Sequence, residues 1–94
     1  WYGIHFMPGS GQSVMKHCVV NYAGWRDNYY YKNAGIYGEG SSPTITDCTI
    51  SHNGAYGIRL KDASPTISSN TISNHSSCGI YCEGTSSPTI DGNT

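Results

Sequence analysis

Short runs of alternating apolar and polar residues recur along the chain in a fixed order. One run contains Gly35-Ile36, and its copies Gly57-Ile58 and Gly79-Ile80 follow at intervals of about 22 residues. Alternation with a period of two is typical of a β-strand with one buried face. Residues that favour turns, namely Gly, Ser, Pro and Asn, separate the runs. The pattern therefore predicts short strands joined by tight corners, repeated along the chain.

Two further blocks repeat with nearly the same spacing. Ser-Pro-Thr-Ile occurs at residues 42–45, 64–67 and 87–90, and a Thr-Ile-Ser block follows Cys48 and then Asn70. Three short strands within one repeat cannot pair with each other, so each pairs with its copy in the next repeat. This arrangement is an all-β solenoid, a parallel β-helix of about four coils. A leucine-rich repeat is excluded because Leu60 is the only leucine. We expect one domain, 1–94, that is either a fragment or an oligomer-dependent unit, with coils 2–33, 34–55, 56–77 and 78–94.

The period of two also predicts the core, as columns of equivalent inward residues. A further column holds Cys18, Cys48, Asn70 and Asn93, where stacked amides can hydrogen-bond to the backbone and to one another. All four cysteines of the chain are predicted to be core thiols, since Cys78 and Cys82 lie about 13 Å apart on one strand. The apolar columns are Ile4/Ile36/Ile58/Ile80, Phe6/Gly38/Leu60/Cys82, Met15/Ile45/Ile67/Ile90 and Val20/Ile50/Ile72.

The blocks Gly35–Tyr37, Ser42–Ile45 and Asn70–Asn74, with their copies, carry a resemblance to a known family. They resemble the right-handed parallel β-helix repeat family, which includes pectate-lyase-like, carbohydrate-binding and sugar-hydrolase repeats. The resemblance covers essentially the whole chain and is specific for the fold rather than for one activity. It implies that polysaccharide lies over one sheet, in a groove walled by turn insertions. It also favours an extracytoplasmic or secreted location.

One predicted strand position points away from the core and carries aromatic and charged side chains. His5, Tyr37, Arg59 and Tyr81 would lie about 4.8 Å apart, close enough for the guanidinium to stack between rings. The first coil also contains an aromatic insertion that leads into this strand. Flat aromatic faces suit sugar rings, and charged groups bind hydroxyls or carboxylates. The candidate ligand-binding residues are His5, Trp25, Arg26, Tyr29, Tyr30, Tyr31, Tyr37, Glu39, Arg59, Tyr81 and Glu83.

Charge and composition narrow the range of partners. The formal net charge is −1, and the few Lys and Arg residues are scattered. Nucleic acids and membrane surfaces need a concentrated basic face, so neither is an expected partner. No apolar run reaches transmembrane length, and no cofactor is expected. The outward aromatic column, the aromatic insertion and the family resemblance then predict non-catalytic polysaccharide binding.

Several alternatives stay open. The chain could be a structural module without a ligand, self-associating through its ends or its aromatic insertion, because exposed aromatics also mark interfaces. It could be part of a polysaccharide lyase or hydrolase: Glu39 and Glu83 would lie roughly 9.6 Å apart, near the upper end for inverting hydrolysis. His52 and His75 fall in equivalent turns and could share a metal. Outward threonine columns could order ice-like water.

Overall fold

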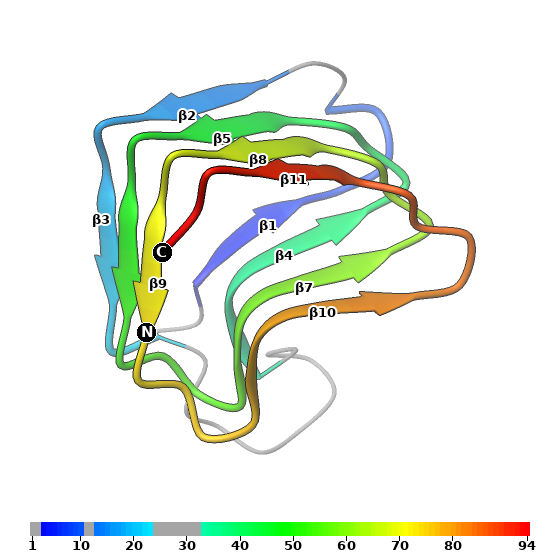
Figure 1. Cartoon of the computed structure of the whole chain (residues 1–94). Helices are drawn as coiled ribbons and strands as arrows, with labels where there is room; N and C mark the ends of the chain where they lie inside the picture. Colours follow the sequence, from blue (N-terminus) through cyan, green and yellow to red (C-terminus); the bar gives the residue numbers. More distant parts are fainter. Residues whose placement is uncertain (1–2, 11–12, 24–32) are drawn as a thin grey trace.

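The computed structural model describes residues 3–10, 13–23 and 33–94, and this part of the chain contains short strands and no helix (Figure 1). Strands form where β-branched and aromatic residues alternate with small polar ones, because such side chains pack well on a pleated surface. The strands are β1 (Ile4–Phe6), β2 (Val14–Lys16), β3 (Val19–Asn21), β4 (Ala34–Glu39), β5 (Thr44–Thr46), β6 (Thr49–Ser51), β7 (Tyr56–Lys61), β8 (Thr66–Ser68), β9 (Thr71–Ser73), β10 (Cys78–Glu83) and β11 (Thr89–Asp91).

The strands form three parallel sheets that run along the stack of coils. Sheet A has the order β1-β4-β7-β10, sheet B the order β2-β5-β8-β11, and sheet C the order β3-β6-β9. Each coil contributes one strand to each sheet in turn, and the last coil ends in sheet B (Figure 1). Pairing is in register, with Ile36 opposite Ile58 and Ile58 opposite Ile80. The predicted parallel β-helix is therefore confirmed.

The interior is filled by the predicted columns of aliphatic residues. Ile36, Ile45, Ile50, Ile58 and Ile67 are fully buried and belong to one hydrophobic cluster. Burial of each such side chain stabilises the fold by roughly 1.5–3 kcal/mol. In the last coil the equivalent residues are more exposed to solvent: Ile80 is half-buried and Ile90 is 49% exposed. Among the described strands, β10 and β11 each pair with one neighbour only.

The cysteines correct one prediction. All four are free thiols, but only Cys48 is buried. Cys18 and Cys78 are half-buried, and Cys82 is exposed although it shares a column with the buried Leu60. Cys82 lies on β10, and among the described strands none pairs with β10 on the side away from β7. Its exposure follows from its place in the stack and not from its direction in the strand.

Each strand from β2 to β11 is followed directly by a residue with a positive φ. Strands of sheet C are followed by Tyr22, His52 and Asn74, with φ of 55°, 53° and 61°. This left-handed conformation ends a strand and redirects the chain, and Asn, Asp, His and Gly adopt it more readily than most residues. The equivalent positions after sheet B are His17, Asp47, Ser69 and Gly92, and those after sheet A are Gly40, Asp62 and Gly84.

The predicted asparagine column forms a hydrogen-bonded ladder at the corner between sheets B and C. The Asn70 side chain accepts from the Cys48 N–H at 2.9 Å and donates to the Ile45 carbonyl at 3.0 Å. Asn93 repeats the pattern one coil later, accepting from the Asn70 N–H and donating to the Ile67 carbonyl, both at 2.9 Å. We call this the first ladder. It satisfies backbone groups that the turn leaves without strand partners.

Candidate ligand-binding face

The outward face of sheet A brings together the predicted column of aromatic and charged residues. Tyr37 lies opposite His5 and Arg59, and Arg59 lies opposite Tyr81. Their strand neighbours Ile36, Ile58 and Ile80 pack in or against the core, so alternation turns this column away from it. The predicted order of the column is therefore confirmed.

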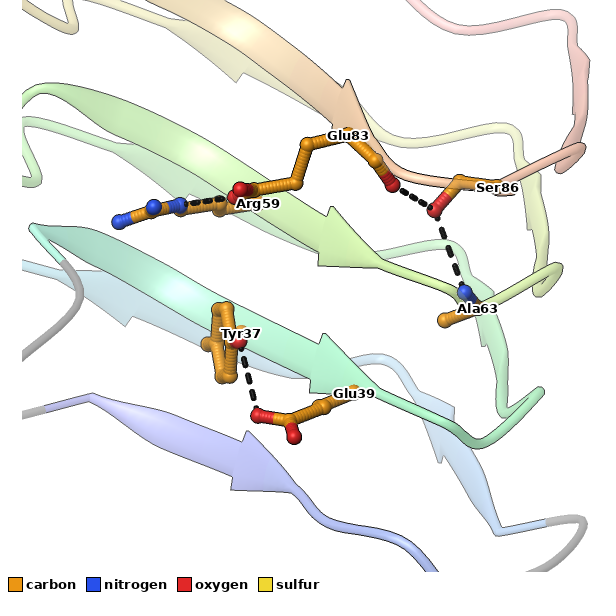
Figure 2. A network of polar contacts seen from close by, with 6 residues as sticks. All are labelled: Tyr37, Glu39, Arg59, Ala63, Glu83 and Ser86. Carbon is orange, nitrogen blue, oxygen red and sulfur yellow. Dashed lines mark hydrogen bonds and ion pairs between the residues drawn. The ribbon is translucent and has the colours of Figure 1, made fainter.

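The environment of Tyr37 differs from the prediction. Its side chain is only 2% exposed, so the ring is not an open platform for a ligand. The His5 ring meets it edge-on with 5.8 Å between centroids, and the Tyr37 hydroxyl donates to Glu39 Oε1 at 2.9 Å (Figure 2). Burial, with the nearby Glu39 carboxylate, raises the pKa of Tyr37 to about 12. Tyr37 is therefore a buried member of the outward column.

Arg59 is held in place by a carboxylate and two aromatic rings. Its Nε donates to Glu83 Oε2 at 2.6 Å, and both side chains are half-buried (Figure 2). The guanidinium carbon lies 5.8 Å from the centroids of both the Tyr37 and Tyr56 rings, within cation–π range. The hydrogen bond that Arg59 donates to Glu83 raises the pKa of Arg59, so the guanidinium stays protonated. The predicted stacking of Arg59 is present, with Tyr56 in place of Tyr81 as the second ring.

Tyr56 is a member of the face that the sequence pattern missed. Strict alternation assigns this first residue of β7 to the same side as Ile58. Its ring nevertheless stacks on Tyr81, with 4.8 Å between centroids and an interplanar angle of 14°. Tyr81 is 39% exposed and lies on β10, the last strand of sheet A. Tyr56 and Tyr81, here called the tyrosine pair, provide the open aromatic surface on the described part of this face.

A row of alternating charges borders the tyrosine pair. Glu39 lies opposite Lys61, and Lys61 lies opposite Glu83, as predicted. The Glu83 carbonyl accepts from Ser86 Oγ at 2.9 Å, and the same hydroxyl accepts from the Ala63 N–H at 3.2 Å (Figure 2). These contacts fasten the end of β10 to the preceding coil. Both carboxylates considered for hydrolysis are already engaged, Glu39 with Tyr37 and Glu83 with Arg59.

The other predicted site residues fall into two groups. His5 lies beside Tyr37 with its Nε2 atom buried and without a hydrogen-bond partner. Trp25, Arg26, Tyr29, Tyr30 and Tyr31 lie outside the described residues.

The two histidines considered as a metal-binding pair make other contacts in the structure. Both ring nitrogens of His75 are within hydrogen-bond distance of backbone groups, and the His52 ring stacks on Tyr22. Within residues 3–10, 13–23 and 33–94, no group of three or more His, Cys, Asp or Glu side chains could hold a metal ion. A search of the same residues for a helix with the length and apolar character to cross a membrane found none.

Comparison with known proteins supports the architecture. A family model described as a right-handed beta helix region matches residues 1–94. The chain belongs to the right-handed β-helix family. Searches of the curated proteins and of the solved structures found no match. Membership of this β-helix family establishes the repeat architecture and leaves the function to be argued from the face itself.

Proposed function

We propose that the outward face of sheet A binds carbohydrate without cleaving it. The observation that carries the proposal is the tyrosine pair, in which Tyr81 is exposed and Tyr56 half-buried, beside the Arg59–Glu83 ion pair. Sugar rings present apolar C–H patches that pack on aromatic faces, while charged side chains hydrogen-bond to the surrounding hydroxyls. These groups lie on paired strands, which hold them in place before a ligand arrives.

The charges of the face favour an uncharged glycan. Arg59 is neutralised by Glu83, and Lys61 lies between Glu39 and Glu83 in the bordering row. A polyuronate would have to compete with Glu83 for the guanidinium and would face two carboxylates. A neutral polysaccharide needs hydrogen-bond donors and acceptors only, and the existing ion pair offers both. We therefore expect hydroxyl-rich neutral chains to bind best.

Affinity electrophoresis tests the proposal directly. The protein is run in native gels that contain neutral or acidic polysaccharides, and reducing ends are assayed in parallel. We expect retardation by a neutral glycan without new reducing ends. Tyr81→Ala should weaken that retardation by about tenfold, since loss of a stacked ring costs roughly 1–1.5 kcal/mol. Tyr22→Ala is the matched control, because Tyr22 is also exposed and stacked but follows sheet C.

Each contrary result removes a different part of the proposal. Unchanged retardation of both Tyr81→Ala and Tyr56→Ala would show that the ligand binds elsewhere. Retardation by acidic polysaccharides alone would contradict the charge argument and leave carbohydrate binding in place. New reducing ends would contradict the non-catalytic assignment. No retardation by any glycan would exclude carbohydrate binding by this face.

A second candidate function is a structural module that associates with a second copy of itself. It is favoured by Ile90, an apolar side chain of β11 that is 49% exposed. Exposed apolar side chains mark surfaces where proteins associate. Sedimentation velocity should then show a dimer that Ile90→Lys converts to monomer. Val14→Lys, at an exposed valine on the outward side of β2, should leave the dimer intact. A monomer at all concentrations would exclude this function.

A further inference from the structure

The corner between sheets C and A contains a second ladder, whose first side chain is Asn53. Asn53 is fully buried. Its Oδ1 accepts from the Ala23 N–H at 2.9 Å, and its Nδ2 donates to the Val20 carbonyl at 3.0 Å. Asn70 follows the same pattern in the first ladder, with Cys48 and Ile45 as its partners. In both ladders the side chain bonds the N–H of the residue one coil earlier and a carbonyl just upstream of that residue.

His75 occupies the next position of this second ladder. Its Nδ1 accepts from the Asn53 N–H at 3.3 Å, and its Nε2 lies 3.1 Å from the Ile50 carbonyl. Asn53 and Ile50 stand in the same relation to His75 as Ala23 and Val20 do to Asn53. The imidazole therefore replaces an amide atom for atom, with Nδ1 in the role of Oδ1 and Nε2 in the role of Nδ2.

The two contacts require a neutral ring in one tautomer. Nδ1 must keep its lone pair to accept the Asn53 N–H, and Nε2 must carry the proton to face a carbonyl oxygen. A second proton would sit on Nδ1 and point at the Asn53 N–H, so that two donors would meet. An amide at this position has no such second state, because it does not titrate near neutral pH.

Among the described residues, the segments that form this corner offer no carboxylate that could pair with a cationic ring. A Cβ atom on Gly57 would lie 2.7 Å from Nε2, so β7 closes one side of the ring. Segments 20–23, 50–57 and 72–79, which form this corner, contain no carboxylate. Their other titratable side chains are Tyr22, His52, Tyr56 and Cys78.

Burial and the nearby basic His52 both favour the neutral ring. Burial lowers the pKa of His75, and His52 lowers it further, while the Ile50 carbonyl acts in the opposite direction. The net direction is downward, which agrees with the geometry of the two hydrogen bonds.

We propose that His75 is a pH-sensitive latch, which fastens the corner between β9 and β10 to the preceding coil when neutral and releases it when protonated. Because the ring is harder to protonate in the folded chain than in the unfolded one, acid favours unfolding. The stabilisation is complete above the ordinary histidine pKa of about 6.5 and is lost as the pH falls below that value and through the folded-state pKa.

Thermal unfolding of three proteins between about pH 7.5 and pH 5 tests the latch. In His75→Asn the amide restores the non-titrating ladder residue seen at Asn53. We expect the midpoint of the unmodified protein to fall by roughly 4 °C or more beyond that of His75→Asn over this range. His52→Asn is the matched control and should keep most of the pH dependence, because burial, the larger cause of the lowered pKa of His75, is unchanged. Asparagine fits there because Asn74 holds the equivalent left-handed position, with φ of 61° against 53° for His52.

A spectroscopic measurement on the unmodified protein is independent of how the variants fold. The side-chain ¹⁵N spectrum at neutral pH should show His75 protonated at Nε2 and unprotonated at Nδ1, with a titration midpoint below that of an unstructured histidine. A proton on Nδ1, or a midpoint at or above the ordinary value, would overturn the proposal. Equal pH dependence of the unmodified protein and His75→Asn would also overturn it.

Discussion

The two ladders follow one hydrogen-bonding rule with different residues and different neighbours. The first ladder, between sheets B and C, uses Asn70 and Asn93, whose amides do not titrate. The second, between sheets C and A, uses Asn53 and then His75, which does. Both satisfy the same kind of backbone group, so the position demands a paired donor and acceptor and not an amide as such. The residue at a ladder position can therefore change from a non-titrating amide to a titrating imidazole while the fold is kept.

The two ladders also differ in what lies against them. A Cβ on Gly35 would lie 2.5 Å from Asn53 Nδ2, and one on Gly57 would lie 2.7 Å from His75 Nε2. The second ladder thus occupies the space of two missing side chains in sheet A. This explains glycine at two positions of the repeated Gly-Ile block: it makes room for the ladder.

The largest expected effect comes from filling that space. Gly35→Ala would drive a methyl group into the buried Asn53 amide and break its bonds to Ala23 and Val20. We expect the free energy of unfolding to fall by about 4 kcal/mol, measured by urea denaturation. Gly79→Ala is the matched control, since its Cβ would meet only an Ile72 methyl group at 3.1 Å. It should cost less than about 1 kcal/mol. Equal losses in the two variants would contradict the spacing argument.

A smaller loss is expected from deleting one amide of the first ladder. Asn70→Ala leaves the Cys48 N–H and the Ile45 carbonyl without their partners inside the protein. Because both groups are shielded from water, the free energy of unfolding should fall by about 2–3 kcal/mol. Asn93→Ala removes equivalent bonds in the half-buried last coil, where water can replace them, and should cost about half as much. If Asn93→Ala lowered the free energy of unfolding more than Asn70→Ala, burial of the asparagine would not determine how much its hydrogen bonds stabilise the fold.

The smallest effect should come from transferring the titrating residue between ladders. Asn93→His would place Nδ1 toward the Asn70 N–H and Nε2 toward the Ile67 carbonyl, as in the contacts of His75. Its folded-state pKa should then be lowered like that of His75, so stability would be complete above about pH 6.5 and lost below it. We expect a loss of about 1 kcal/mol in acid beyond that of the unmodified protein. Asn93→Gln is the control, because glutamine does not titrate. If it lost as much folding free energy in acid as Asn93→His, the histidine would not be the cause of the loss.

The repeat predicted the fold because it encodes pairing directly. Equal spacing of Ile36, Ile58 and Ile80 places them opposite one another once the coils stack, and the pairing observed is this one. The column of Asn70 and Asn93 was predicted for the same reason. The second ladder was not predicted, because Asn53 and His75 are different residues and share no visible motif. Asn53 and His75 occupy equivalent positions one repeat apart, and this equivalence was the signal that would have revealed the second ladder.

The candidate face was only partly predictable. Alternation placed Tyr37, Arg59 and Tyr81 in one outward column in the correct order. It did not foresee that Tyr37 is buried, or that Tyr56 joins Tyr81. The direction of a side chain follows from its own strand, whereas its exposure depends on groups one coil away. For the same reason, the exposed Ile90 and the buried Ile67 share one column and differ only in their place in the stack.

The amino-acid sequence by itself determined the strands, their register and the residues that point inward, since these follow from local alternation and equal spacing. Tertiary structure alone decided which outward rings stay open, which carboxylate holds Arg59 and which histidine serves as a ladder residue. These properties arise from contacts between neighbouring coils. Each such contact joins residues far apart in sequence. The repeat pattern allows several partners for one side chain, and side-chain packing decides which of them it contacts.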